Sequence, residues 1–305
     1  NQELEANTNW RQLTQLMFGQ IPQENEHAWY NFQNQYFRCI VEVDKTIGRV
    51  MEHLENSSFA DNTVVVFTSD HGELAGAHGL RSKEGGSFEE AMAVPLLIKT
   101  PNQDMGLRYN GVSSHLDLVP TILAFAGASR AQQQQFAPEL KGYNLAGFVD
   151  SGYRSGGIRQ NALLMPTCLH ELDKDIMALA MSGGLTLKKI KTIAEVLEVP
   201  PKFFDERNFF RGVVDSQYKF CRYFRATQHH APSSWGELLE NNQLELYDII
   251  NDPKELVNLA LQPQRYQALI MAMNTKLAQL ISAEIGEDLG GHMPGPKVIW
   301  QLKKA

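Results

Sequence analysis

The stretch TVVVFTSDHGELAGAHGLRSK, residues 63–83, joins an apolar run to a loop crowded with titratable side chains. Its first part, TVVVFTS (63–69), places β-branched residues on both faces, which predicts a central parallel strand covered on each side. Its second part sets an aspartate, two histidines and a lysine among glycines. Ligands bind at the carboxyl ends of strands in open α/β sheets, because the loops diverge there. The stretch therefore predicts an α/β fold with a functional site at the end of this strand.

The flanking segments alternate between helix and strand patterns. Residues 26–55 carry apolar side chains at three- and four-residue steps, which predicts one long helix with a single apolar stripe. A short helix is expected over SFEEAMA (87–93), and a second buried strand over VPLLIKTP (94–101). SSHLDLVPTILAFAG (113–127) is typical of a helix capped by one of its leading serines. This order predicts a doubly wound sheet.

The second half of the chain has a different pattern. Residues 173–198 are predicted to be helical, and the alternating segments around DSQ in 211–226 predict a hairpin. A further strand over 242–253 and an amphipathic helix over 263–286 complete a small antiparallel α+β subdomain. We expect three parts: the α/β core in 1–150, a helical insertion or linker in 151–205, and the carboxyl-terminal subdomain in 206–305.

Asp70 and His71 are the first candidates for chemistry. An aspartate supplies a hard oxygen and a neutral imidazole a borderline nitrogen, so the pair could form half of a metal site. Neighbours in a regular strand face opposite ways, so both can reach one ion only if the backbone bends, which Gly72 permits. Lys83 suits a bound oxyanion or a leaving oxygen that gains negative charge. His78 lies in a second glycine-flanked turn.

Composition argues against several classes of function. A net charge of −7 and an isoelectric point near 5.7 give no electrostatic footprint for nucleic acid. No apolar stretch approaches the roughly 20 residues that span a bilayer, so no membrane span is expected. Residues 185–204 have the outline of a helix-turn-helix, but the second segment opens with two prolines and carries little positive charge, which favours a helical insertion.

Four segments in order resemble the sulfatases of the alkaline-phosphatase-like superfamily. The stretch NTVVVFTSDHGELAGAHGLRSKEGGSFEEAMAVPLLIKTP (62–101) resembles their second metal-binding segment. The helix before it, the SSHLDLVPT segment and the ELYDIINDPKELVNLA segment resemble other parts of that family. The resemblance implies that Asp70 and His71 bind one divalent metal ion and that Lys83 contacts the sulfate or the leaving oxygen. It also allows His78 to act as a second cation or acid.

The resemblance further implies the identity of the metal and the substrate. Calcium is the usual ion of the family, although an imidazole ligand leaves magnesium, manganese or zinc open. The expected substrate is a small molecule or saccharide that carries a sulfate ester.

The nucleophile segment of that family has no match in this chain. Neither C-x-P-x-R nor S-x-P-x-R occurs, and the paired aspartates that complete the metal site are missing as well. We therefore expect this chain to be the carboxyl-terminal half of such a protein, with formylglycine formed only in the amino-terminal half. The opening NQELEANTNWRQ fits a chain that is preceded by more residues.

The function expected from the sequence is a metal-dependent sulfuric-ester hydrolase that is active only when complete. A phosphonate monoester or phosphodiester hydrolase of the same superfamily is one alternative. A non-catalytic binding protein that keeps the fold is the other.

Overall fold

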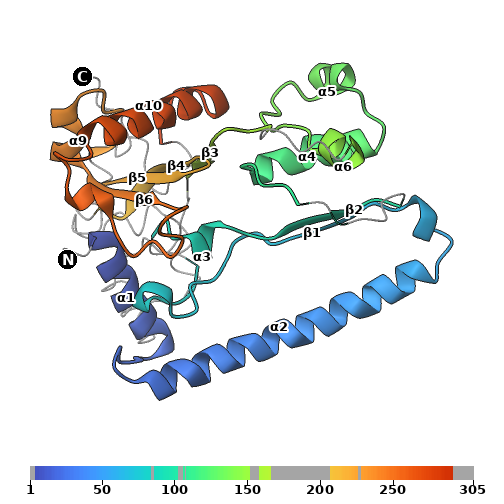
Figure 1. Ribbon diagram of the computed structural model, residues 1–305, viewed down its shortest axis with the longest axis horizontal. Helices are drawn as coiled ribbons and strands as arrows, with labels where there is room; N and C mark the ends of the chain where they lie inside the picture. Colours follow the sequence, from blue (N-terminus) through green and yellow to red (C-terminus); the bar gives the residue numbers. More distant parts are fainter. Residues whose placement is uncertain are drawn as a thin grey trace, which may run out of the picture.

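A four-stranded antiparallel sheet forms the better-packed part of the molecule (Figure 1). The computed structural model describes residues 4–83, 86–101, 106, 108–151, 158–165, 207–225 and 228–290. The strands are β3 (Ala162–Leu164), β4 (Phe209–Val214), β5 (Tyr218–Phe224) and β6 (Gln243–Asp248), in that spatial order. The hairpin expected around DSQ is confirmed, because β4 and β5 pair directly across that turn.

Helices cover both faces of this sheet. On one face α10 (Gln267–Glu284) and α9 (Trp235–Asn241) bury apolar side chains against Val213, Phe220 and Leu246. On the other face the start of α1 (Glu5–Phe18) packs on Cys221 and Tyr223. Trp10 and Leu13 of α1 then extend this core to the loop that follows β1 (Val65–Thr68). The sheet therefore supports the loop that carries the candidate site residues.

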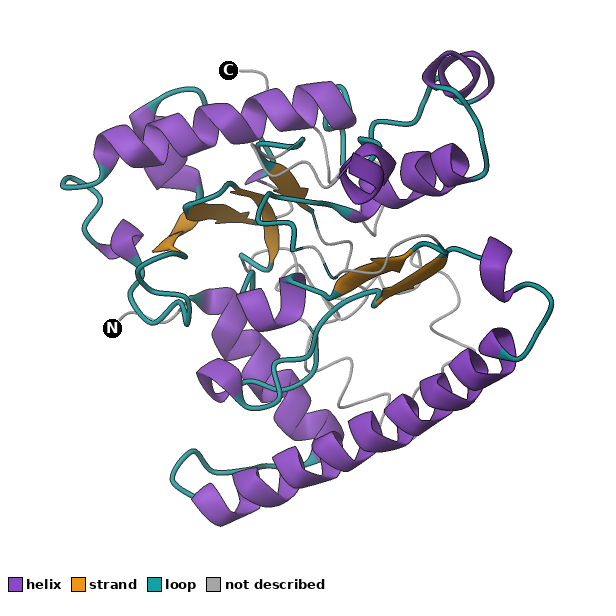
Figure 2. Ribbon diagram, turned by 45° about the vertical axis from the view of Figure 1, so that its right-hand side comes forward, coloured by secondary structure: helices purple, strands orange, loops and turns teal. Residues whose placement is uncertain are grey.

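The strand predicted as central and parallel has a different environment. Among the described residues, β1 pairs only with β2 (Leu96–Lys99), and the pairing is antiparallel (Figure 2). Phe67 in β1 and Leu97 in β2 are 40% and 58% exposed, so the described residues do not bury the two strands as the sequence predicted. The β-branched pattern predicts the strands but does not specify their neighbours.

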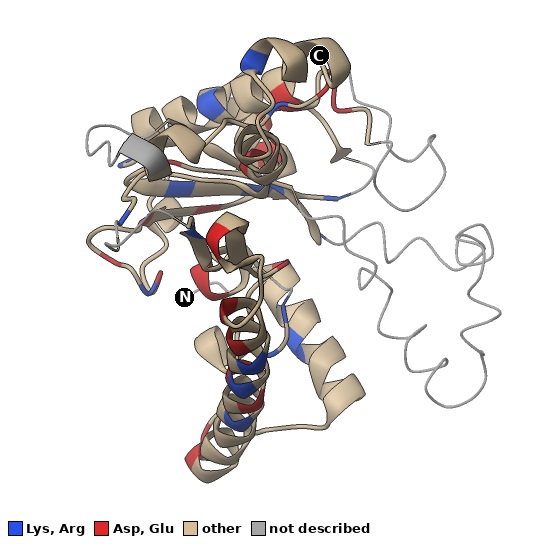
Figure 3. Ribbon diagram, turned by 90° about the vertical axis from the view of Figure 1, so that its right-hand side faces the viewer, with Lys and Arg blue, Asp and Glu red and all other residues tan. Residues whose placement is uncertain are grey.

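The long helix is confirmed with the predicted bounds. It is α2 (Glu26–Glu55). Asn25 is its N-cap, and the Asn25 side chain accepts a hydrogen bond from the Ala28 N–H. None of its 30 residues is buried, and Ile40, Val43 and Val50 of the apolar stripe are about half exposed or more. Charged residues of both signs lie along the same helix (Figure 3). The stripe is therefore present without a packing partner in the described part of the chain.

Shorter elements connect these parts. They are η1 (Ala60–Asn62), η2 (Ala77–Gly79), α3 (Glu89–Met92), η3 (His115–Asp117), α4 (Leu118–Phe125), α5 (Arg130–Phe136), α6 (Ala146–Ser151) and η6 (Leu259–Leu261). The predicted serine cap is Ser114, which forms a capping box with Asp117. The short helix expected over 87–93 is α3.

Buried ion pairs join distant elements. Arg159, in the segment before β3, contacts Asp117 at 2.9 Å and also Glu284 of α10. Its side chain is 2% exposed, so it serves packing and is not available to a substrate. Because β3 lies within 151–205, that segment contributes a strand to the carboxyl-terminal sheet. The three-part division of the chain stays a prediction.

Some expectations fall outside the described residues. These include the helix over 173–198 and the helix-turn-helix outline over 185–204. No helix in the described ranges combines the length and the apolar content that crossing a bilayer takes.

Candidate functional site

The backbone bends sharply after β1, and the bend brings Asp70 and His71 together. The Nε2 atom of His71 lies 3.4 Å from Oδ2 of Asp70. The backbone N–H of His71 donates to Oδ1 of Asp70 at 3.0 Å, and this bond is the largest of the effects that lower the pKa of Asp70. The Asp70 side chain is 84% exposed and ionised at neutral pH. Two consecutive residues thus direct their donor atoms to one side of the chain.

Lys83 closes this group from the far end of the loop. Its Nζ atom lies 2.9 Å from Nε2 of His71. The other ring nitrogen, Nδ1, lies 2.8 Å from the Gly72 carbonyl, which can only accept, so Nδ1 carries the hydrogen. The lone pair of Nε2 therefore accepts from the Lys83 ammonium. Three of the four residues predicted from sequence lie in one cluster.

The donor atoms of Asp70 and His71 suit a shared divalent cation. Metal–ligand distances near 2.0–2.5 Å place neighbouring ligands of one ion about 3–3.5 Å apart, and the measured separation is 3.4 Å. The bond from Nδ1 to a carbonyl also orients the ring so that Nε2 is the nitrogen with the lone pair, as is usual for metal-bound histidine, although Lys83 donates to that nitrogen here. These two residues fit half of a coordination shell, and further ligands would have to come from another segment.

Sequence reasoning missed three residues that shape the bend. The Ser69 hydroxyl donates to the His71 carbonyl at 2.8 Å, and Nε2 of His115 donates to the Ser69 carbonyl at 2.9 Å. Glu73 accepts from the backbone N–H groups of Ala75 and Ser82 at 3.0 and 2.7 Å. The SSHLD pattern contained His115, but only the fold shows that it reaches the loop.

Gly72 is needed for space and not for an unusual dihedral angle. Its φ is not positive, yet a Cβ atom added there would overlap the backbone carbonyl of Glu90. The Gly72 N–H donates to the carbonyl of Ala91 at 2.9 Å, which ties the bend to α3. The glycine therefore permits a close approach of two backbone segments.

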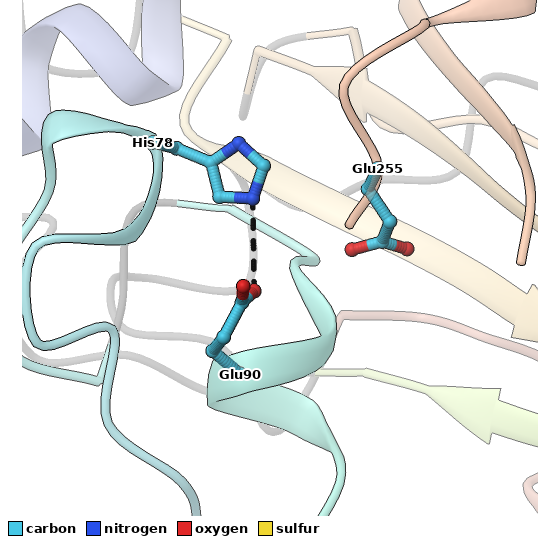
Figure 4. A group of neighbouring side chains, drawn as sticks. All are labelled: His78, Glu90 and Glu255. Carbon is cyan, nitrogen blue, oxygen red and sulfur yellow. Dashed lines mark ion pairs between the residues drawn. The ribbon is translucent and has the colours of Figure 1, made fainter. Parts of the chain in front are cut away.

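His78 lies in a second group of side chains (Figure 4). Its ring stacks on Phe88 at 3.6 Å between centroids, and Nε2 lies 3.6 Å from Oε2 of Glu90. Burial lowers the pKa of His78, although Glu90 acts in the opposite direction. Among the contacts of the described residues, His78 meets this group and not the cluster around Lys83.

The second group also contains Glu255. One ligand atom from each of His78, Glu90 and Glu255 lies within 4.8 Å of the others. The ammonium of Lys219, however, contacts Glu255 and lies 3.0 Å from Glu89. Burial by itself would lower the pKa of Lys219, but these two carboxylates outweigh it and raise the pKa. Because a protein cation already balances Glu255, we interpret the group as a buried ion-pair network.

The carboxyl-terminal sheet anchors the end of the loop. The Ser87 hydroxyl donates to Oε2 of Glu245 at 2.9 Å, and the Ser87 N–H donates to the Tyr223 hydroxyl at 3.0 Å. Tyr223 and Tyr247 both donate to the same carboxylate, at 2.6 and 3.1 Å. Ser87 lies four residues after Lys83, so strands β5 and β6 help to position that lysine.

Comparison with known proteins identifies the family. A family model described as Sulfatase matches residues 4–128, which include the bend, the loop and Lys83. The chain belongs to the sulfatase family. An endo-4-O-sulfatase of Bacteroides thetaiotaomicron is 31% identical over 247 residues, which are 80% of this chain and 41% of that protein. The members are hydrolases of the alkaline-phosphatase-like superfamily.

Solved structures of this superfamily share the fold. A 2-O GAG sulfatase aligns with a TM-score of 0.62 at 19% identity, covering 92% of this chain and 50% of that one. The phosphonate monoester hydrolase of Agrobacterium radiobacter aligns with a TM-score of 0.54 at 22% identity, covering 81% and 40%. This chain therefore has the fold of these enzymes and spans about half of the length of the relatives that it matches.

Proposed function

We propose that the complete protein hydrolyses sulfate esters and that this chain supplies one half of the active site. The observation that carries the proposal is the cluster of Asp70, His71 and Lys83 at the end of β1. An exposed carboxylate, an oriented imidazole lone pair and an ammonium group meet there, and a sulfate ester needs positive charge around its oxygens. Membership of the sulfatase family supports the same reading.

Asp70 and His71 would hold one divalent ion, with calcium first and magnesium, manganese or zinc as alternatives. When bound, such an ion would polarise the sulfate group and stabilise negative charge on its oxygens. The Nδ1–H group of His71 donates to the Gly72 carbonyl and would hold the ring with Nε2 toward the ion. Lys83 would move its hydrogen bond from His71 to an oxygen of the substrate, which becomes the better acceptor as it gains charge.

The nucleophile and the remaining ligands are proposed to come from an amino-terminal segment of the same protein. The relatives are about twice as long, and the apolar stripe of α2 and the faces of β1 and β2 are uncovered in the described residues. Apolar surfaces of this extent mark packing or interaction sites. A further half of an α/β sheet would cover them and complete the site.

The organic part of the substrate is proposed to be a saccharide. The relative named above is an endo-4-O-sulfatase, and one structural neighbour is a 2-O GAG sulfatase. Similarity to a phosphonate monoester hydrolase keeps phosphonate and phosphodiester esters as the second candidate.

The test is hydrolysis by the full-length protein. We expect it to cleave 4-nitrophenyl sulfate faster than bis(4-nitrophenyl) phosphate, and to lose activity after treatment with a chelator. Asp70→Asn and His71→Ala should each lower kcat/KM by about 100-fold or more, because each removes a metal ligand. Asp61→Asn, in an exposed turn, is the matched control and should retain activity.

Three results would overturn parts of the proposal. Full activity of the Asp70→Asn protein would exclude the metal assignment. Preference for the phosphodiester would favour the second candidate. No hydrolysis of either ester would favour a non-catalytic binding protein.

A further inference from the structure

A polar cavity of about 300 Å³ lies beside the loop that carries Lys83. Residues from the end of α1, the segment that leads to α2, the start of α2 and the loop line it. Arg11 and Arg81 line it from different elements. Its volume is at the lower end of the range for small-molecule sites, which is enough for one sugar ring.

Arg81 is the unusual member of this lining. Its side chain is 5% exposed, and no carboxylate of the described residues forms an ion pair with it. Its Nη2 atom donates to the backbone carbonyls of Thr14 and Gly19, which holds the guanidinium in place. In the described part of the chain Nε and Nη1 have no hydrogen-bond partner. Burial accordingly lowers the pKa of Arg81, with no acidic group to oppose it.

A buried cation without a counter-charge is costly unless an anion meets it. Arg11 adds a second guanidinium to the same cavity, held by the carbonyls of Gly79 and His78 at 3.4 and 3.3 Å. Two oriented guanidinium groups are suited to the oxygens of a sulfate, phosphate or carboxylate. Glu24 also lines the cavity but is exposed, so its charge is screened by solvent.

The other side chains that line the cavity are suited to bind the hydroxylated ring of a sugar. Gln15 and Gln20 offer amide donors and acceptors, and Trp29 contributes an aromatic surface. The indole N–H of Trp29 donates to the Pro22 carbonyl at 3.1 Å, which fixes the orientation of the ring. An oxyanion on a sugar-sized molecule would use both the guanidinium groups and these side chains.

We propose that this cavity is a second anion-binding site, which accepts a sulfated or carboxylated sugar residue. It is separate from the cluster of Asp70, His71 and Lys83. The proposal rests on the proposed function only in the choice of a sulfated sugar as the probe. Arg81, two residues before Lys83, would connect occupation of this site to the loop of the candidate active site.

The test is calorimetric titration of the full-length protein with glucose 6-sulfate, glucose and inorganic sulfate. All titrations use an Asp70→Asn background, so that binding at the candidate metal cluster does not contribute. We expect glucose 6-sulfate to bind more tightly than either glucose or inorganic sulfate. Arg11→Gln should weaken its binding about 10-fold or more, while Arg130→Gln, an exposed arginine on α5, should leave it unchanged.

A second variant distinguishes loss of anion binding from loss of folding. Arg81→Lys keeps the charge but loses the fork of donors, and it should also weaken glucose 6-sulfate binding by about 10-fold. A crystal of the full-length protein soaked in selenate should show an anomalous peak between Arg11 and Arg81.

Several results would overturn the proposal. They are equal affinity for glucose and glucose 6-sulfate, equal affinity for inorganic sulfate and glucose 6-sulfate, or unchanged binding in Arg11→Gln and Arg81→Lys. Failure of sulfate-ester hydrolysis with intact, Arg11-dependent binding would instead reject the proposed function and leave this site standing.

Discussion

Removing the Tyr223 hydroxyl tests whether the carboxyl-terminal sheet positions the loop that carries Lys83. This hydroxyl donates to Glu245 at 2.6 Å and accepts from the Ser87 N–H at 3.0 Å, and the side chain is fully buried. Tyr223→Phe removes the hydrogen bond to Glu245, which is worth about 0.5–1.5 kcal/mol. It also leaves the buried N–H of Ser87 unpaired, at a cost of about 1–3 kcal/mol. We therefore expect a loss of roughly 2–4 kcal/mol in the free energy of unfolding.

The substitution Tyr223→Phe should also lower the rate of sulfate-ester hydrolysis. Ser87 lies four residues after Lys83, so a looser anchor should displace the ammonium group and lower kcat/KM by about tenfold. The free energy of unfolding is measured by urea denaturation, and kcat/KM with 4-nitrophenyl sulfate on the full-length protein.

Tyr218→Phe is the matched control on the same strand. The Tyr218 hydroxyl accepts only an exposed hydrogen bond from Gln217, so its loss should change the free energy of unfolding by less than about 0.5 kcal/mol. If Tyr223→Phe is no more destabilising than Tyr218→Phe, the anchoring role of the network is wrong. If stability falls but kcat/KM is unchanged, the network supports the fold without positioning the loop.

Three further predictions follow from local geometry. Gly72→Ala should destabilise the protein by about 1–3 kcal/mol through overlap with the backbone of α3. Gly236→Ala, at an exposed position of α9 with open space around it, should be neutral or stabilising. Similar thermal shifts in the two variants would contradict this prediction. Burial would raise the pKa of Asp288, but hydrogen bonds from His229 and Arg211 outweigh it and hold the pKa well below its usual value. The stabilising effect of ionised Asp288 is thus present above about pH 4 and lost as the pH falls below that value. Urea unfolding should show that Asp288→Asn is about 3 kcal/mol less stable than the unchanged protein at pH 7, and that this difference is smaller at pH 3. A difference that stays constant with pH would refute the assignment. Lys83→Ala should lower kcat/KM by about 100-fold without changing the affinity for the metal, which is measured by titration. Weaker metal binding in this variant would instead show that Lys83 acts as a structural partner of His71.

Much of the local structure could be predicted because it depends on neighbouring residues. The apolar repeat of α2, the turn between β4 and β5 and the cap at Ser114 are each specified by a short pattern. The sequence predicted a parallel neighbour for β1, whereas its neighbour among the described residues is antiparallel, since a β-branched run has the same sequence signature beside either. No sequence pattern identified the two carboxylate partners of Arg159, which lie 42 positions before it and 125 positions after it.

The sequence alone determined the types of chemical group and the family to which they belong. Asp70, His71 and Lys83 could be selected because they occur together after a strand and because their order along the chain resembles the pattern of a known family. Tertiary structure alone decided which groups meet. It separated His78 from the cluster around Lys83 and joined Ser87 to Glu245 across 158 positions of the chain. It also buried Arg81 beside a cavity, where no carboxylate of the described ranges pairs with it. The physical reason is that side-chain chemistry is local to the chain, whereas distance, burial and charge balance depend on how remote segments pack.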